Sequence, residues 1–575
     1  MLRRLAGVGL LALAACATAT QSVAISPLVA LAPSNEVTPE MILAFNAICT
    51  ADAGVGRKST PDLKLAAGMG TGGFKVDTKS KSAQDWFDYG LALSHAFYHE
   101  DAILAMAEAV KADPDCSLCA WGQAWVLGPT LNYGIDDKGR EKALAAAMKA
   151  QSLAKAGDMK AKRLADAIVA RYAPAAASKG GLNYLGAAKA GESKTEPAFG
   201  AEMAKIAADY PDETELSVLA AHTLLIPVRG GNKNGLKPAL AILEKVLKDH
   251  PKDTGAIHYY IHATEFDGRA EDAIPYANEL GRLAPAGSHL VHMPAHTFFH
   301  AGRYHDAAVV NAKAMQADVE WLAAGGDPAP PRTPGSGMAM YYAHNLTFGL
   351  AGALMSGDAQ LALKYADHAE KYYAAPTFTD GQRAYPVPRT WVALARYAPE
   401  RALALPEQKG DVRNLLYRAY ARGEAFLLKG DAAGARGELA ALKKLKSDSV
   451  ELPLARAVLE GRIAMAEGNP RKAGAIFESA AGLQDAKLSD SWDPPGWWYP
   501  VRRSAAAAWL KAGDFKRAEA QAEKSLATWK HDPLALWVLG NAQLGLGHLG
   551  QGEGTLVEAR DLWRGDFETI SEDTI

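Results

Sequence analysis

The chain has 575 residues, with 62 Lys and Arg against 65 Asp and Glu, so its formal net charge at pH 7 is −3. Because no cluster of basic residues stands out, nucleic acid is an improbable partner. Hydrophobic residues make up 49% of the chain, Ala and Leu are abundant, and β-branched runs are scarce. This composition is typical of helices that pack through small residues, and it predicts an all-α protein.

Residues 1–16 have the character of an export signal. Two arginines precede an apolar run, Leu5 to Ala15, that is too short to span a bilayer. The run ends Leu13-Ala14-Ala15-Cys16, which resembles a bacterial lipoprotein cleavage box. That resemblance implies lipidation of Cys16, removal of the residues before it and, with Ala17 next, sorting to the outer membrane. The alternative is an ordinary cleaved signal; either way the mature protein works in an oxidising compartment.

The rest of the chain carries the spacing of tetratricopeptide (TPR) repeats, which are about 34 residues long. Small residues let two antiparallel helices approach, a large residue fills the gap, and proline stops the second helix. The cleanest copy is Gly461, Gly468, Ala473, Phe477 and Ala480. The spacing predicts a TPR-type α-solenoid of about nine helix pairs.

Composition and period divide the chain into successive segments. These are a tether with one helix (17–80), TPR-like helices (81–175), irregular helical repeats (176–251), a His-rich TPR pair (252–320), a Pro/Gly loop (321–340), TPR repeats (341–486), a Trp/Pro loop (487–498) and C-terminal repeats (499–575). Residues 325–335 are too rich in Gly and Pro for a helix. Long loops in compact arrays are often functional.

Histidines concentrate in one stretch, where residues 258–344 hold eight of the chain's 15. His258 and His262 form one H-x-x-x-H pair, and His292 and His296 form another 34 residues later. Residues i and i+4 share one face of a helix, and packed helices lie about 8–10 Å apart. The four imidazoles are therefore predicted to converge. Further candidates near them are His289, His300 and His344.

Converging imidazoles predict a transition-metal site, with Zn or Cu as the candidates. The lack of a carboxylate cluster argues against Ca or Mg. Glu265, one turn after His262, is a candidate metal ligand, a candidate hydrogen-bond partner of a metal-binding histidine, or a candidate general base. In the alternative interpretation, the histidines are hydrogen-bonding groups in a polar groove that binds a peptide with Tyr259 and Tyr260. Pro294 can begin a helix, which would leave His289 and His292 in the preceding loop.

Three other sets of residues are candidates for binding. Cys116 and Cys119 form a C-x-x-C segment that is interpreted as a local disulfide, with a soft-metal site as the alternative. Arg502 and Arg503 can clamp a ligand carboxylate or cap a helix. Asn345, next to His344, is a weaker ligand-binding candidate.

Several segments resemble a group of bacterial TPR proteins whose activities are largely uncharacterised. The matching segments include Cys116 to Gly122, His258 to Glu265, His289 to His296, His344-Asn345 and Tyr499 to Arg502. In TPR arrays the first helix of each pair lines the concave surface, where ligands usually bind. The resemblance therefore implies that the histidines lie on that surface.

The function predicted from these patterns is an exported binding or scaffold protein with a protein or peptide partner and a His-rich site. One alternative is a metal-dependent enzyme that uses Glu265 as its base. Another is a purely structural adaptor for envelope assembly. No G-x-S-x-G, P-loop, dinucleotide or H-E-x-x-H motif is present, so enzymatic activity rests on the His/Glu cluster alone.

Overall fold

The structure is a computed structural model that describes residues 63–132, 134–173, 195–323, 337–376, 378–488 and 495–575, without the side chains of residues 319–340. The predicted signal segment, Cys16, the tether as far as residue 62 and Cys49 lie outside these ranges. No helix in the described part is long and apolar enough to cross a membrane.

The described ranges contain helices and no β-strand. In chain order the helices are α2 (Lys81–His95), α3 (His99–Ala112), α4 (Ser117–Val126), α5 (Asp137–Leu153), α6 (Met159–Tyr172), α8 (Thr195–Asp209), α9 (Thr214–Arg229), η2 (Lys233–Gly235), α10 (Leu236–Asp249), α11 (Thr254–Asp267), η3 (Ala270–Ala273), α12 (Ile274–Leu283), α13 (Ser288–His292), α14 (Pro294–His300), α15 (Tyr304–Ala323), α16 (Gly337–Ser356), α17 (Ala359–Tyr373), α18 (Asp380–Arg383), α19 (Pro386–Tyr397), α20 (Pro399–Leu403), α21 (Val412–Leu428), α22 (Ala432–Lys444), α23 (Glu451–Ala466), α24 (Pro470–Leu488), α25 (Val501–Lys511), α26 (Phe515–Leu526), α27 (Pro533–Gly545), α28 (Leu549–Leu562) and η4 (Phe567–Thr569).

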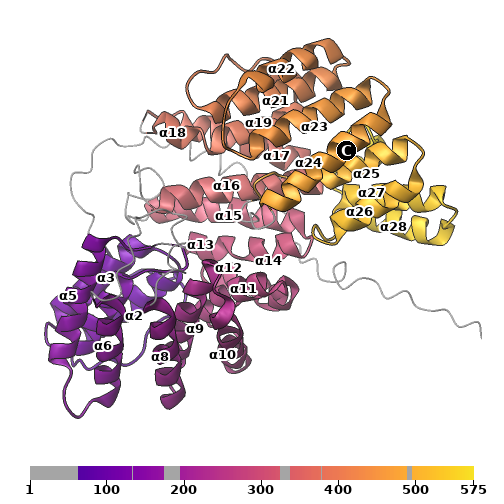
Figure 1. Ribbon diagram of the computed structural model, residues 1–575. Coiled ribbons are helices and arrows are strands. Elements are labelled where there is room, and N and C mark those ends of the chain that lie inside the picture. Colours follow the sequence, from indigo (N-terminus) through magenta and orange to yellow (C-terminus); the bar gives the residue numbers. More distant parts are fainter. Residues whose placement is uncertain (1–62, 133, 174–194, 324–336, 377, 489–494) are drawn as a thin grey trace, which may run out of the picture. The chain divides into compact units, whose positions relative to one another are not determined.

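Consecutive helices pack against each other in pairs, and each pair packs on the next, as Figure 1 shows along the colour sequence. The pairs include α2 with α3, α8 with α9, α21 with α22, and α27 with α28. The all-α, TPR-type solenoid predicted from the sequence is thus the observed fold. Alanines supply much of the buried surface between helices, which allows the close approach that the repeat spacing implied.

The turns within pairs follow a recurring pattern. Asp358, Asp431 and Asp514 each cap the next helix by accepting a hydrogen bond from the backbone N–H three residues on. The glycine before each aspartate has a φ of +74° to +77°, the left-handed conformation that glycine adopts without strain. At Gly302, which has the same conformation, a side chain would also collide with the carbonyl oxygen of Lys530.

The helix boundaries near the histidines differ in detail from the prediction. α15 continues to Ala323 and α16 begins at Gly337, so helix extends into both ends of the segment predicted as a loop. Pro294 does begin a helix, α14, but the residues before it form the short helix α13. Met293, between the two, also has helical backbone angles, and His292 and His296 therefore remain one turn apart.

Candidate metal centre

Five helices bring the histidines together. α11 carries His258, His262 and Glu265, and α13 carries His289 and His292. His296 and His300 lie on α14, and His344 comes from α16, so the site joins three consecutive repeats. α15 packs on α13, α14 and α16 and completes the surroundings.

The imidazoles separate into two groups of three, a division that the pair spacing did not predict. The first trio is His258, His262 and His289, and the second trio is His292, His296 and His344. In each trio every residue offers one nitrogen, and the three nitrogens lie within 4.8 Å of one another. The trios are adjacent, since the ring centroids of His262 and His296 are 5.3 Å apart. Glu265 forms a further cluster with these two histidines and so lies between the trios.

In the second trio, Nε2 of His292 lies 3.0 Å from Nε2 of His296 and 3.1 Å from Nε2 of His344. Nitrogens that share a tetrahedral zinc ion, with Zn–N bonds of about 2.0–2.1 Å, are separated by roughly 3.3 Å. These nitrogens therefore already stand at coordination spacing.

In His292 and His296, hydrogen bonds made by Nδ1 fix which ring nitrogen carries the proton and which carries the lone pair. Asn311 donates from Nδ2 to the carbonyl oxygen of Ala307, so its Oδ1 faces Nδ1 of His292, at 2.7 Å. Nδ1 of His292 therefore donates, and its Nε2 carries a lone pair. On the other ring, Nδ1 of His296 donates to Oε2 of Glu265 at 3.1 Å. A neutral His296 therefore also presents a lone pair at Nε2.

Two lone pairs that face each other at 3.0 Å require a cation between them. A proton on Nε2 of His296 can supply the charge for this one contact. A metal ion can accept all three nitrogens at once. The carboxylate and amide behind the rings are the outer partners typical of metal-bound histidine.

The first trio is less fully hydrogen-bonded. Nδ1 of His258 donates to the carbonyl oxygen of His95 at 2.6 Å, which leaves the Nε2 lone pair facing Nε2 of His289 at 3.2 Å. Neither ring nitrogen of His262 is within hydrogen-bond distance of a partner, although this residue is only 1% exposed; its nearest polar contact is from Nδ1 to Oε2 of Glu265, at 3.6 Å. An unpaired buried polar group costs about 1–3 kcal/mol, and a bound ion would remove that cost.

Protonation in the first trio suits metal binding. Burial is the main cause that lowers the pKa of His258, His262 and His289. Neighbouring imidazoles lower these pKa values further, because each opposes a positive charge on the next. The three rings are therefore neutral near pH 7, which is the form that binds a metal.

Glu265 stays ionised in spite of its surroundings. Burial alone would raise its pKa, but the charge of His296, the nearby imidazole of His262 and hydrogen bonds from His296 and His300 hold the pKa well below its usual value. His300 reaches Oε1 of Glu265 at 3.2 Å and belongs to neither trio. The side chains of Glu265 and His300 are 13% and 22% exposed. The centre therefore approaches solvent on this side.

An aromatic shell surrounds both trios. Phe97 stacks on His289 with ring centroids 4.8 Å apart, and Tyr341 lies 4.7 Å from the same ring. Phe348 lies within 6 Å of all three rings of the second trio. The six trio histidines are each at most 5% exposed. They therefore form a buried centre, and the prediction that they line an open concave surface is wrong.

The tyrosines proposed for a peptide groove are buried as well. Tyr259 is fully buried and its hydroxyl is 3.0 Å from Nδ1 of His95, whose Nε2 is 2.6 Å from Glu215. Tyr260 packs edge-on against Tyr276. Asn345 is fully buried, and its amide has no hydrogen-bond partner. None of the three predicted binding residues faces an open groove.

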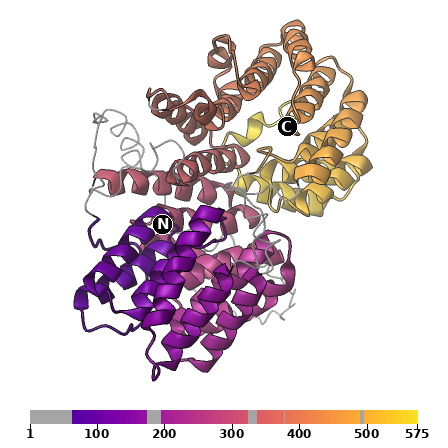
Figure 2. The same ribbon diagram turned by 60° about the vertical axis from the view of Figure 1, so that its left-hand side comes forward.

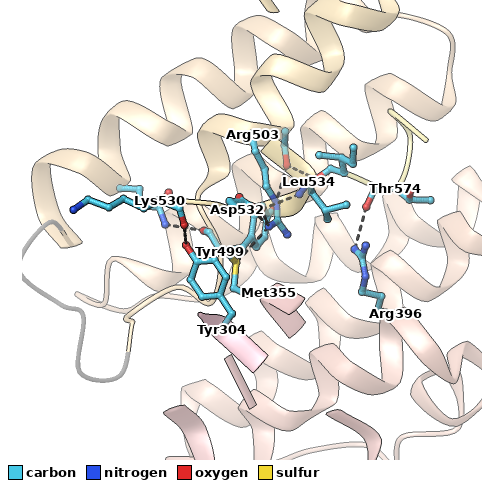
Figure 3. A network of polar contacts seen from close by, with 12 residues as sticks. Tyr304, Met355, Arg396, Tyr499, Arg503, Lys530, Asp532, Leu534 and Thr574 are labelled. Carbon is cyan, nitrogen blue, oxygen red and sulfur yellow. Dashed lines mark hydrogen bonds and ion pairs between the residues drawn. The ribbon is translucent and has the colours of Figure 1, made fainter. Parts of the chain in front are cut away.

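The arginine pair has structural partners instead of a free clamp. Arg503 is buried and binds both carboxylate oxygens of Asp532, at 3.0 and 3.1 Å (Figure 3). Arg502 pairs with Asp485 and donates to Gln521 at 2.7 Å. These contacts join α25 to α24, α26 and the start of α27. The carboxylate-clamp interpretation is therefore wrong for the structure as it stands.

Cys116 and Cys119 form a disulfide at the start of α4, in agreement with the interpretation as a local bridge. The disulfide excludes the soft-metal alternative in this oxidised state, because both sulfurs are bonded to each other.

Three functional features had no individual sequence signal. Asn311 contacts His292 from the next helix, α15, whereas the carbonyl oxygen of His95 and the ring of Phe97 contact the histidines from more than 160 residues away in the chain. His95 was one histidine outside the dense stretch, and an asparagine in a helix is not distinctive. Only the packing of distant repeats reveals their role.

No protein-family description and no curated protein matches the chain. Among solved structures, Naa15/Naa10 bound to HypK-THB is similar over 84% of this chain and 71% of that one, with 14% identity and a TM-score of 0.24. The P58(IPK) TPR domain is similar over 81% and 98%, with 14% identity and a TM-score of 0.21. A human IFIT1 dimer with PPP-AAAA is similar over 91% and 94%, with 12% identity and a TM-score of 0.28. At TM-scores this low, no functional site of these proteins is assigned to this chain.

Proposed function

We propose that this protein is a TPR-type binding protein whose central repeats hold two transition-metal ions, one in each histidine trio. The observation that carries the proposal is the convergence of three imidazole nitrogens within 4.8 Å of one another in each trio, with Nε2 atoms 3.0–3.2 Å apart. Six imidazoles without sulfur favour zinc or copper, and the Irving–Williams order places copper above zinc. Glu265, between the trios, orients His296 and lowers the cost of placing positive charge in a buried site.

A chelator is expected to destabilise the metal-loaded protein. An ion that binds only the folded chain stabilises it by about 4 kcal/mol when free metal stands 1,000-fold above its dissociation constant. Removing both ions with a chelator should therefore lower the free energy of unfolding by roughly 8 kcal/mol, about 4 kcal/mol per ion, measured by urea denaturation followed by circular dichroism. Identical unfolding curves for loaded and stripped protein would count against the proposal.

One observation favours a second function, that of a metal-dependent enzyme. Each trio supplies three protein ligands, and zinc sites with three protein ligands keep a fourth position for water or substrate. Glu265 is ionised and near the solvent-facing side, as a general base must be. It already accepts hydrogen bonds from His296 and His300, however, and this favours an orienting role.

The proposed location is the cell envelope, with a lipid on Cys16 as the only membrane attachment. The support is the sequence before Cys16 and the disulfide, which suits an oxidising compartment. Cys16→Ser is expected to release the protein into the soluble envelope fraction, because the acyl chains supply the membrane affinity. Fractionation and immunoblotting would detect this, and unchanged membrane association would point to a protein partner as the anchor.

A further inference from the structure

Residues 566–575 lie along the C-terminal repeats, where the structure holds them mainly by their main chain. Arg396 on α19 donates to the carbonyl oxygen of Thr574 at 3.0 Å, a contact visible in Figure 3. Arg462 on α23 and Ser504 on α25 both donate to the main-chain oxygen of Ile575, at 2.9 and 2.6 Å. Figure 2 shows this end of the chain, marked C, among the orange and yellow helices.

The side chains of the segment add two more contacts. Ile575 is 1% exposed and belongs to the same apolar cluster as Leu510 and Val538. Lys511 on α25 forms an ion pair with Asp573. The segment therefore combines a buried aliphatic residue, an acidic residue and a main chain that is recognised from three helices. The main chain is folded back on itself, with a 3-10 helix at Phe567–Thr569 and a turn in which the N–H of Thr574 donates to the carbonyl oxygen of Ser571.

Charge on the two sides is complementary. Residues 566–575 contain four acidic and no basic residues. The helices that face them present Arg396, Arg462 and Lys511 to the segment. Main-chain recognition does not depend on side-chain identity, so these contacts suit other acidic peptides as well.

The segment does not fill the space available to it. A cavity of about 610 Å³ lies beside it. The repeats line the cavity with Tyr397, Tyr420 and Trp498, and the segment itself contributes Thr569, Ile570 and Asp573. A cavity of this size accommodates several additional side chains, and aromatic walls with a few charged groups are typical of binding sites.

We propose that this groove, formed by α19, α23 and α25, docks a short acidic peptide of a partner protein, and that residues 566–575 occupy it in cis as a competitor. The proposal deepens the protein-binding role of the repeats and does not depend on the metal centre. A tethered segment acts at an effective concentration of the order of mM, so a partner peptide must outcompete it. A change that weakens the binding of the tethered segment to the groove must therefore strengthen the binding of a peptide added in solution.

The test uses the full chain and a fluorescent synthetic peptide with the sequence of residues 566–575. Ile575→Asp places a charge in the apolar cluster and should loosen the tethered segment. Fluorescence anisotropy is expected to show at least about tenfold tighter peptide binding by Ile575→Asp than by the unchanged chain. Adding Arg396→Ala to this variant should weaken binding again by about tenfold, because one main-chain hydrogen bond to the peptide is lost.

Arg436→Ala is the matched control, because Arg436 is an exposed arginine of the same repeats that pairs with Glu467 instead of the segment. In the Ile575→Asp background it should leave peptide affinity unchanged. A peptide with its four acids replaced by amides should bind more weakly. Equal binding by Ile575→Asp and the unchanged chain, or equal loss from both arginine changes, would overturn the proposal.

Hydrogen exchange in the unchanged chain provides a test that does not rely on a variant folding. Excess unlabelled peptide should increase the exchange of the amides in residues 566–575, because it displaces them. Unchanged exchange at peptide concentrations in the mM range would overturn the proposal. Metal content should stay the same in every variant, so a failure here is distinct from a failure of the metal centre.

Discussion

His292→Ala is expected to reduce the number of tightly bound metal ions from about two to about one per chain. His292 is central to the second trio, since its Nε2 lies within 3.1 Å of those of His296 and His344. Loss of even an outer partner of a ligand usually costs 10–100-fold in metal affinity, so loss of a ligand should cost more than about 100-fold. His258→Ala should likewise remove the ion of the first trio, and the double variant should bind neither.

The measurement is titration of stripped protein with Zn²⁺ or Cu²⁺ in the presence of a competing indicator. His548→Ala is the matched control, because this histidine is exposed and distant in sequence from both trios. It should keep both ions. If His292→Ala and His548→Ala bind the same amount of metal, the second trio is not a metal site.

Glu265→Gln is expected to keep the fold and both ions, with about 10–100-fold weaker metal affinity. The amide has nearly the same shape as the carboxylate, but it lacks the charge that orients His296 and His300. If the centre is instead catalytic, the same change removes the base: the variant would hold its metal but lose turnover.

Metal titration and an activity screen against hydrolysable substrates together separate these outcomes. The geometry favours weaker metal affinity over loss of turnover as the outcome, because Oε2 and Oε1 of Glu265 each face an imidazole. Unchanged affinity of Glu265→Gln would contradict the orienting role. Complete loss of a detected activity with metal retained would establish the enzymatic alternative.

The fold followed from the sequence because its determinants are local. Gly468 and Ala473, for example, stand at the spacing that a helix pair requires, and they form the turn before α24 and part of its buried face. The pairing of His258 with His262 and of His292 with His296 on common faces was also local, since it depends only on helical periodicity.

The division into two trios could not be predicted in the same way. His289 joins His258 across a repeat, and His344 joins His292 from 52 residues away. Which rings meet depends on how three repeats pack, and the H-x-x-x-H spacing contains no such information. Burial was missed for a related reason: the rings are covered by Phe97, between α2 and α3, and by Phe348 on α16, and neither phenylalanine carries a metal-site signature of its own.

The partner of Arg503 could not be predicted from the sequence either. Arg503 follows an aromatic segment, a context that suited a ligand clamp, but its charge is neutralised by Asp532, 29 residues later. A buried arginine needs such a carboxylate, because an unpaired buried charge is strongly destabilising. The sequence contains many acidic residues, and only the packing of α25 on α27 identifies the partner.

Metal content is the most direct test of the central claim. The full chain should be isolated from the cells that produce it naturally, without chelators or added metal, and analysed by inductively coupled plasma mass spectrometry. The two trios predict about two zinc or copper ions per chain. Protein that is folded by circular dichroism yet contains no transition metal, and takes up none when it is offered, would contradict the account.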